Sequence, residues 1–332
     1  YIVKRDPDGN WCKWTGSAYT SLITGLNNVV NCMAEAPDGK IYVGGSFTDA
    51  GSDAAADYIA RWNPITELWE KIVQLNSNAL SMVFDANGNL YIGGSFANVG
   101  GVANADYIAK ISNLSGTPTV SALGTGLNGF CYSIAISPDG YLYAGGDFTL
   151  AGGVTNTNHI AKYNPSTNTW SALSTGLNNT VRTLAFAPNG DAYVGGAFTD
   201  TAYPYLCKWD GTSFSVVGTN TDINGTIQMI AFDEIGWLYA GGDFTNAGGN
   251  ANADYIARWN GNQWEPLGTG TNDTVYGVLI NYGKVYTVGS FTKAGGLTLT
   301  DRVAVWSNGA WQPLDIDLPG TAYVNSILPA SD

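Results

Sequence analysis

The chain has 332 residues, a net charge of −13, 45% hydrophobic residues and only 12% charged residues. This acidic balance argues against a nucleic-acid-binding protein, because such proteins use Lys and Arg to neutralise phosphates, and it disfavours adsorption to anionic membranes. No apolar run approaches the roughly 20 residues of a membrane-spanning helix, so we expect no membrane insertion.

The low charge means that Asn, Thr, Ser and Gly must cover most of the surface. This composition is typical of secreted, surface-exposed or virion proteins, and it predicts a location outside the cell, on the cell surface or on a virion. The chain begins at Tyr1 without a methionine or a signal-peptide pattern. We therefore expect a processed form or an excerpt of a longer protein.

One pattern, Tyr-x-Gly-Gly-x-Phe, returns along the whole chain. Its copies begin at Tyr42, Tyr91, Tyr143, Tyr193 and Tyr239, with a degenerate sixth copy at Tyr286. The second glycines stand 49, 52, 50, 46 and 47 residues apart. A period in this range indicates a repeat architecture.

Each repeat contains four strand-like segments separated by turn signals. In the first complete repeat the first three cover residues 30–36, 42–47 and 57–63, and the first segment ends at the tight turn Pro37-Asp38-Gly39. The fourth is an aromatic-x-x-Leu strand, such as Trp170-Ser171-Ala172-Leu173. Glycine inside a strand costs up to ~1 kcal/mol, so the recurrent Gly-Gly predicts close approach by a neighbouring backbone or a large ring. Four antiparallel strands with regular glycine and aromatic positions are typical of a propeller blade.

The segment count predicts the number of blades. Six full blades lie between residues 29 and 316, residues 1–23 supply later strands, and residues 322–329 supply one more first strand. We therefore predict an all-β fold: a single seven-bladed β-propeller domain over residues 1–332, with four-stranded antiparallel blades. The seventh blade would be a composite of 1–23 and 322–329, so that both termini close the last blade and leave no open edge.

The repeats also resemble known families. The Gly-Gly strand, the aromatic residue of the third strand and the Trp that opens the fourth strand resemble kelch-type propellers. The combination of Gly-Gly-x-Phe-Thr, Ile59-Ala60-Arg61-Trp62-Asn63 and Trp-x-x-Leu-Gly-x-Gly-Leu-Asn is more similar to the propeller of the cortical cell-polarity marker family. The resemblance implies surface-exposed binding or scaffolding. Kelch-type folds also include enzymes, so function does not transfer with the fold.

The sequence offers little for catalysis. His159 is the only histidine, which excludes a Ser-His-Asp triad and argues against the histidine-ligated copper site of kelch-like oxidases. It replaces Tyr58, Tyr107 and Tyr255 of sister repeats, so we interpret it as a framework residue. We predict no catalytic residues. A carboxylate pair for glycoside cleavage stays open, since the two groups need only meet in space.

The four cysteines and Glu35 occupy positions that we expect to lie in the core. We interpret Cys12, Cys32, Cys131 and Cys207 as core thiols, because they have no metal-binding spacing and two of them replace a repeated alanine. Glu35 stands where the other repeats carry a large apolar residue, and a carboxylate at such a position must be paired or change its pKa. The sister residues are Phe84, Ile136, Phe186, Phe232 and Ile280.

The candidate ligand-binding residues come from differences between repeats. An early position of the first strand is mixed, whereas the next positions are regular. It reads Asn31, Leu80, Tyr132, Arg182, Gln228, Tyr276 and Val324. The loop 198–205 is shorter and aromatic, with Tyr203 and Tyr205. We select Asn31, Tyr132, Arg182, Gln228, Tyr276, Tyr203 and Tyr205, because rings beside hydrogen-bonding groups suit a sugar or a peptide loop.

One stretch resembles part of a calcium loop. Asn220, Asp222 and Asn224 have the spacing of the first ligands, but Ala231 occupies the place of the closing Glu. We therefore expect no cofactor, with calcium as the one alternative left open.

The favoured hypothesis is a non-enzymatic binding or scaffolding propeller for a protein or a glycan, within a larger surface or virion assembly. The alternative hypothesis is a carbohydrate-active enzyme that uses carboxylates at the channel mouth.

Overall fold

The structure is a computed structural model, and it describes residues 3–5, 11–14, 19–21, 25–51, 55–298, 300–314 and 327, the first three ranges as backbone only. The described residues fall into two compact units. Unit 1 holds the described residues up to Gly126, and unit 2 holds Leu127–Leu314 together with Ile327.

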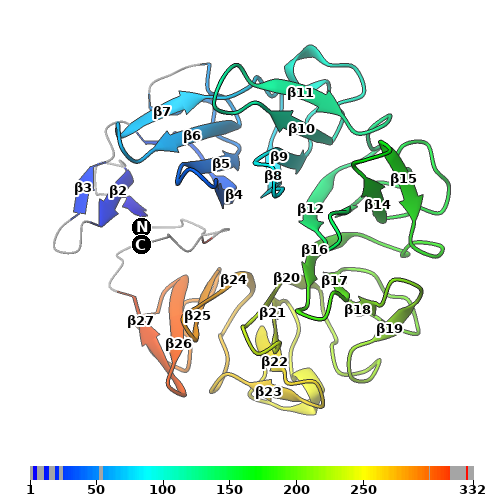
Figure 1. The fold of residues 1–332 in the computed structure, drawn as a ribbon. Coiled ribbons are helices and arrows are strands. Elements are labelled where there is room, and N and C mark those ends of the chain that lie inside the picture. The colour runs from blue at the N-terminus through cyan, green and yellow to red at the C-terminus, as the bar shows by residue number, and fades with distance from the viewer. Residues whose placement is uncertain are drawn as a thin grey trace. The chain divides into compact units, whose positions relative to one another are not determined.

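Unit 1 contains two four-stranded antiparallel blades and a three-stranded sheet (Figure 1). The first blade has β4 (Val30–Glu35), β5 (Ile41–Gly45), β6 (Ile59–Asn63) and β7 (Leu68–Lys71). The second has β8 (Ala79–Phe84), β9 (Leu90–Gly94), β10 (Ile108–Ser112) and β11 (Thr119–Ala122), with the 3-10 helix η1 (Val99–Gly101) in its loop. The three-stranded sheet has β1 (Val3–Arg5), β2 (Trp11–Trp14) and β3 (Tyr19–Ser21).

Unit 2 contains four blades of the same order, in which each strand pairs with the next strand of the chain. The first comprises β12 (Cys131–Ile136), β13 (Leu142–Gly146), β14 (Ile160–Asn164) and β15 (Thr169–Ala172). The second comprises β16 (Val181–Phe186), β17 (Ala192–Gly196), β18 (Leu206–Trp209) and β19 (Phe214–Val216). The third comprises β20 (Ile227–Phe232), β21 (Leu238–Gly242), η2 (Ala247–Gly249), β22 (Ile256–Trp259) and β23 (Trp264–Pro266). The fourth comprises β24 (Val275–Asn281), β25 (Lys284–Gly289), β26 (Val303–Ser307) and β27 (Ala310–Pro313).

The prediction of an all-β propeller with four-stranded antiparallel blades is confirmed, but the prediction of seven blades is wrong. The described residues form six such blades. The N-terminal strands β1, β2 and β3 pair only with one another, and within the described ranges no fourth strand joins them. The segment 322–329, predicted to complete that sheet, lies outside the described residues except for Ile327.

The miscount has a physical reason. An apolar run predicts which side chains face a core, but a blade exists only where neighbouring strands share ladder hydrogen bonds. In all six blades the four paired strands are consecutive in the chain. The seventh would have needed a strand from the opposite end of the chain, and no short connection enforces that pairing.

The two glycines of the repeated pattern fit two different neighbours. A Cβ on the second glycine, Gly146, would lie 1.9 Å from the carbonyl oxygen of Phe130, in the link that precedes the same blade. A Cβ on the first glycine, Gly145, would lie 2.3 Å from Cγ1 of Val181, in the next blade. The predicted close approach is therefore confirmed, because one glycine admits a backbone carbonyl and the other admits the neighbouring inner strand.

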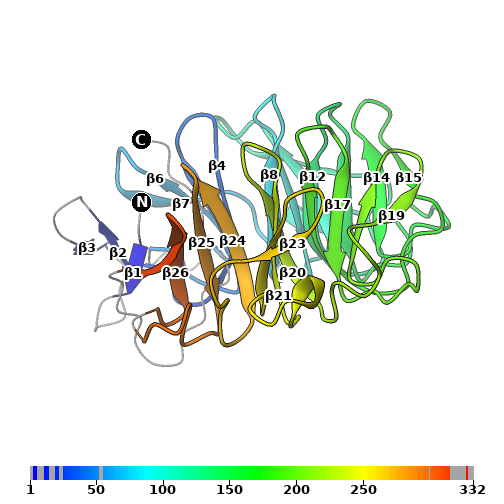
Figure 2. The same ribbon diagram turned by 90° about the horizontal axis from the view of Figure 1, so that it is seen from below.

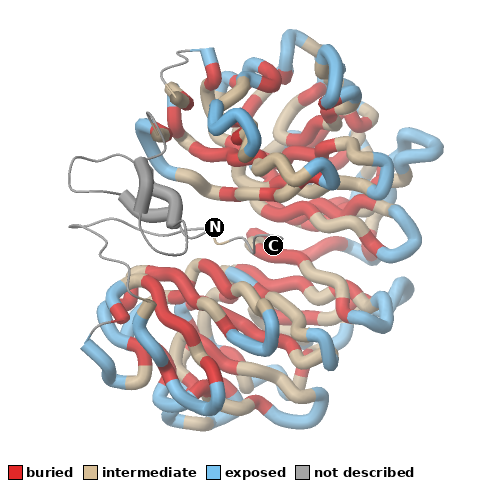
Figure 3. The backbone as a smooth tube through the Cα atoms, turned by 60° about the vertical axis from the view of Figure 1, so that its left-hand side comes forward, coloured by how far each residue is buried: buried red, intermediate tan, exposed pale blue. Residues whose placement is uncertain are grey.

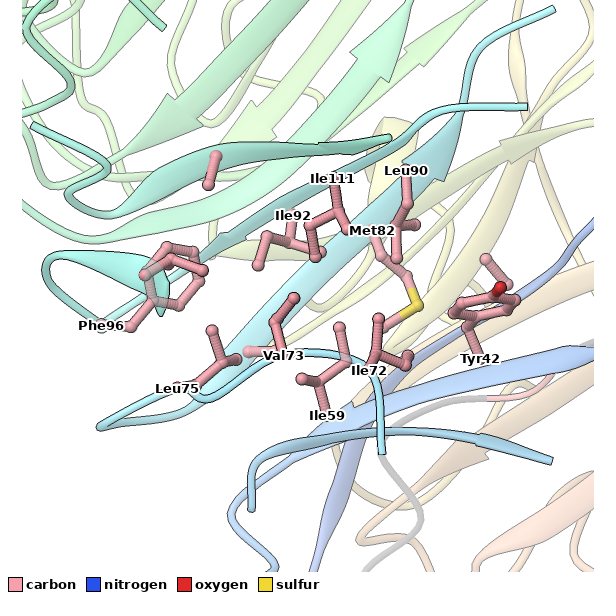
Figure 4. Packing of buried hydrophobic residues seen from close by; sticks show 14 of the residues in the cluster. Tyr42, Ile59, Ile72, Val73, Leu75, Met82, Leu90, Ile92, Phe96 and Ile111 are labelled. Carbon is pink, nitrogen blue, oxygen red and sulfur yellow. The ribbon is translucent and has the colours of Figure 1, made fainter. Parts of the chain in front are cut away.

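The hydrophobic core lies between the blades of each unit. In unit 1, Figure 4 shows Tyr42 and Ile59 of the first blade beside Met82 and Leu90 of the second. The ring of Tyr42 meets the ring of Phe84 edge-on at 5.0 Å. Figure 3 shows the buried inner segments in red and the exposed loop tips in pale blue.

Cys32, Cys131 and Cys207 are buried free thiols, as predicted, and burial raises the pKa of each. The side chain of Cys12, the fourth predicted core thiol, lies outside what the structure describes.

Candidate functional site

The mixed position found in the sequence is the extra residue of a β-bulge in every blade. In the first blade of unit 2, Cys131 pairs with Gly146 and Ser133 pairs with Gly145, so Tyr132 has no opposite residue. The same shift occurs in the other five blades. The six bulge residues are Asn31, Leu80, Tyr132, Arg182, Gln228 and Tyr276.

A bulge explains why this position varies. The extra residue makes no ladder pair, and the bulge turns its side chain away from the regular two-faced pattern of the strand. All six bulge residues are half-buried, whereas the residue before each of them, except Val30 in the first blade, is buried. Neither ladder pairing nor close packing therefore selects the side chain at the bulge.

A repeated asparagine ties the loops at the bulge end together by hydrogen bonds. In the first blade of unit 2, Asn128 Oδ1 accepts hydrogen bonds from the backbone N of Thr149 and of Leu150, both at 2.8 Å. The equivalent asparagines bind the same loop position in the other blades at 2.8–2.9 Å. They are Asn27, Asn76, Asn178, Asn224 and Asn272.

Unit 2 brings four of the predicted residues into one row. Its inner strands β12, β16, β20 and β24 lie side by side (Figure 1). The side view in Figure 2 shows that loops connect the strands at both ends of the blades. Two buried hydrogen bonds set the registry: Leu184 N donates to Ser133 Oγ at 3.0 Å, and Ile230 N donates to Thr183 Oγ1 at 3.2 Å. The bulge residues Tyr132, Arg182, Gln228 and Tyr276 form what we call the bulge row.

The best-defined part of the bulge row is the contact between Tyr132 and Arg182. The guanidinium carbon of Arg182 lies 4.5 Å from the centre of the Tyr132 ring, which is a cation–π geometry. The Tyr132 hydroxyl donates to Asp147 Oδ2 at 2.7 Å, and the Thr180 hydroxyl donates to the other carboxylate oxygen of Asp147. Burial, followed by the hydrogen bond to the Asp147 carboxylate, raises the pKa of Tyr132.

The next residue of the bulge row, Gln228, also contacts a carboxylate, through a longer hydrogen bond. Gln228 Nε2 donates to Asp243 Oδ2 at 3.4 Å. Asp147 and Asp243 occupy the variable place of the Gly-Gly-x-Phe pattern, where the other blades carry Ser46, Ser95, Ala197 and Ser290. This difference between repeats was visible in the sequence and could have identified both carboxylates, but the sequence analysis did not select them.

Asn31, Tyr203 and Tyr205 are not members of the bulge row. Asn31 belongs to unit 1, where its Nδ2 donates to the carbonyl oxygen of Ala79 at 3.3 Å. Tyr203 packs at 5.7 Å on Phe214, which is in the outermost strand β19. Tyr205 has φ +63°, shared with its counterparts Tyr58, Tyr107, His159, Tyr255 and Arg302 at +60° to +63°, so it is a framework residue.

The side chains of the calcium candidates form hydrogen bonds within the protein. Asp222 accepts a hydrogen bond from Thr219 N at 2.9 Å and another from the Thr219 hydroxyl at 2.6 Å. Asn224 is one of the repeated loop-binding asparagines, and Asn220 Nδ2 donates to the carbonyl oxygen of Thr201 at 3.3 Å. Among the residues that the structure describes, no three His, Cys, Asp or Glu side chains gather as a metal-binding group.

No helix within the described part of the chain is long and apolar enough to span a membrane.

Solved structures share the fold at low sequence identity. The WD40 repeats of RRP9 match with a TM-score of 0.59 and 14% identity, over 91% of this chain and 84% of that one. The extracellular domain of a putative one-component system from B. thetaiotaomicron matches with a TM-score of 0.56 and 14% identity, over 92% of this chain. This chain spans only 38% of that domain. A GH74 enzyme of Niastella koreensis matches with a TM-score of 0.56 and 16% identity, over 88% of this chain and 46% of the enzyme.

Sequence families give a narrower assignment. No curated protein matches the chain. A family described as a domain of unknown function (DUF5122) with a β-propeller fold matches residues 36–64. The family described as the Rax2 C-terminal beta propeller domain matches residues 111–280, which is just over half of the chain. The chain therefore belongs to the family of the Rax2 C-terminal β-propeller domain.

Proposed function

We propose that this protein is a non-enzymatic binding or scaffolding module for a protein or a glycan, and that the bulge row of unit 2 contacts the ligand. The observation that carries the proposal is the repeated bulge. It exposes one residue per inner strand on a rigid framework, and these residues differ between blades. Rigid scaffolds with variable exposed positions are the usual arrangement of binding sites.

The chemistry of the row supports the same proposal. Tyr132 and Tyr276 offer rings, Gln228 offers an amide, and Arg182 offers a cation. Tyrosine and arginine are enriched at the energetic centres of binding interfaces, because each combines a large contact area with polar groups. The proposal includes a location outside the cell, on the cell surface or on a virion, which the composition and the resemblance to kelch-type and cortical cell-polarity marker repeats support.

The test is a triple variant, Tyr132→Ala, Arg182→Ala and Tyr276→Ala. Wild type and variant are applied to a glycan array and panned against a displayed random-peptide library. We expect wild type to bind at least one probe and the variant to lose it, while the melting temperatures nearly coincide, because the bulge residues make no ladder pairs. A control variant, Ile235→Asn with Tyr282→Asn, changes exposed apolar residues in the turns at the opposite strand ends and should bind like wild type.

Unaltered binding by the triple variant would move the site away from the bulge row. The same array separates the binding module from a carbohydrate-active enzyme. Asp147 and Asp243 are the carboxylates beside the row, and both accept hydrogen bonds from its members. A binding module returns the bound glycan intact, whereas cleavage products that vanish in the Asp147→Asn, Asp243→Asn variant would establish the enzyme.

A further inference from the structure

Arg182 differs from the other arginines whose side chains the structure describes. Arg61 pairs with Glu70 at 2.5 Å, Arg258 pairs with Glu265 at 2.8 Å, and Arg302 pairs with Asp301 at 2.9 Å. Arg182 forms no ion pair with any described acid. Its Nε is buried and has no hydrogen-bond partner among the described groups.

The carboxylate beside Tyr132, Asp147, is already engaged. Both oxygens of Asp147 accept hydrogen bonds, one from the Tyr132 hydroxyl and one from the Thr180 hydroxyl. The Arg182 guanidinium instead lies over the Tyr132 ring at 4.5 Å, which limits its orientation. Within the described residues the Arg182 cation is held by the Tyr132 side chain and by no carboxylate, so its guanidinium can still bind an anion from outside the chain. The planar guanidinium fork fits a carboxylate best, because two parallel hydrogen bonds can form.

Exposed apolar side chains lie on the blade of Tyr132, the residue whose ring Arg182 covers. The ring of Phe130 meets the ring of Tyr132 edge-on at 6.3 Å, and Phe130 is 42% exposed. Leu150, in the loop that Asn128 fixes, is 38% exposed. The other blades of unit 2 carry polar residues at both positions: Thr180, Thr226 and Thr274 for Phe130, and Asp200, Asn246 and Lys293 for Leu150.

We infer that Phe130, Tyr132, Leu150 and Arg182 bind a peptide segment of another protein in which a carboxylate stands next to an apolar side chain. The inference rests on the proposed function and names the partner class. Arg182 would bind the carboxylate, and Phe130 and Leu150 would contact the apolar side chain. A peptide fits better than a sugar, because Arg182 already covers one face of the Tyr132 ring and Phe130 meets it edge-on. Little of that ring is left to stack on a sugar.

The experiment begins with a displayed random-peptide library panned against the wild-type chain. The most enriched peptide is synthesised together with a derivative in which each carboxylate is replaced by its amide. We expect the enriched peptides to share an acidic residue beside an apolar one. The amide derivative and the Arg182→Gln variant should each weaken binding by about tenfold or more, and the Arg182→Lys variant by less.

Two further variants test the apolar contact and the specificity of the charge effect. Phe130→Thr and Leu150→Asn install the residues of sister blades and should weaken binding about threefold to tenfold each. Lys284→Gln is the charge-matched control, because Lys284 is exposed and begins β25, next to the turn at the opposite end of the inner strand β24. It should stay within about twofold of wild type, since exposed distant charges are screened by salt. Melting temperatures verify that each variant is folded.

The outcomes separate this inference from the proposed function. Binding of peptides by wild type that Arg182→Gln leaves unchanged would overturn the inference and leave the proposed function standing. Binding of an oligogalacturonate probe through Arg182, with no peptide enriched, would do the same. If wild type binds neither peptide nor glycan, the proposed function fails and the inference fails with it.

Discussion

Each inner strand of unit 2 contains a packed position, where the residue type is alike in all four blades, and a bulge position, where it varies. Two residues beyond the bulge, Ile134, Leu184, Ile230 and Val278 are all aliphatic and buried. At the bulge, the same four strands carry Tyr, Arg, Gln and Tyr, all half-exposed. Packing against the neighbouring blade selects the first set, whereas no ladder partner selects the second. The comparison teaches that this fold separates stability from recognition within a few residues of one strand.

The largest expected effect is that of replacing Gly146, where the missing side chain leaves room for the backbone at the bulge. A Cβ at Gly146 would lie 1.9 Å from the Phe130 carbonyl oxygen, so Gly146→Ala must push that backbone aside. We expect a loss of about 3 to 5 kcal/mol in the free energy of unfolding, measured by urea denaturation. Gly140→Ala is the control, because a Cβ there has no neighbour within 4 Å and only its φ of +84° is strained. It should cost about 1 kcal/mol.

A loss at Gly146 no larger than at Gly140 would show that the link carbonyl moves easily, and the bulge end would then not be rigid.

The pH dependence of the free energy of unfolding compares the packed framework with the bulge, through one tyrosine in each. Burial raises the pKa of the framework Tyr143 to about 12, and this residue packs edge-on against Phe186 at 5.0 Å. Above pH 10 the unfolded chain ionises this tyrosine while the folded chain retains the proton. The free energy of unfolding therefore falls as pH rises from about 10 to 12, by roughly 1 to 3 kcal/mol for this residue.

Tyr143→Phe should flatten that part of the curve, whereas Tyr132→Phe at the bulge should flatten it less, as measured by urea denaturation at several pH values. Equal slopes in the two variants would contradict the division between the regions.

The repeated asparagine connects the two regions, because it holds the bulge-end loop to the framework. Asn128→Ala removes two backbone hydrogen bonds to Oδ1 and one from Nδ2 to Thr149 Oγ1 at 2.9 Å. Since the site is exposed and water can replace these partners, we expect a loss of about 1 to 2 kcal/mol in thermal or urea unfolding. Asn128→Asp keeps the acceptor and should lose less. Equal losses would mean that the Nδ2 donor matters more than the acceptor.

The smallest effect is expected at Glu35, a framework position that departs from the repeat. Glu35 lines an open depression of about 580 Å³ with Phe84 and Asp85 of the neighbouring blade. Glu35→Phe restores the large apolar residue of the sister blades and should leave the unfolding free energy unchanged or raise it by about 1 kcal/mol. Urea denaturation measures the change, and Glu35→Gln controls for loss of charge alone. A clear destabilisation by Phe would assign the carboxylate a structural role.

The sequence by itself determined the repeated part of this protein. The recurrent Gly-Gly, the turn residues and the alternation of apolar residues predict the strands of six blades, because each depends on neighbours within about 50 residues of chain. The variable position of the first strand was also found from sequence, since comparing repeats separates packed positions from exposed ones. The sequence did not reveal that this position is a bulge, because a bulge is defined by the partner strand.

Only the tertiary structure decided what lies beside each variable residue. It places Arg182 over Tyr132 and leaves it without an ion pair among the described acids, although these residues belong to different blades. It places Tyr203 against the outermost strand and Tyr205 in the framework, away from the row. It also contains six blades where the strand count predicted seven. Local patterns report burial and turns, whereas partners from different strands meet only through packing and ladder hydrogen bonds, which no single segment encodes.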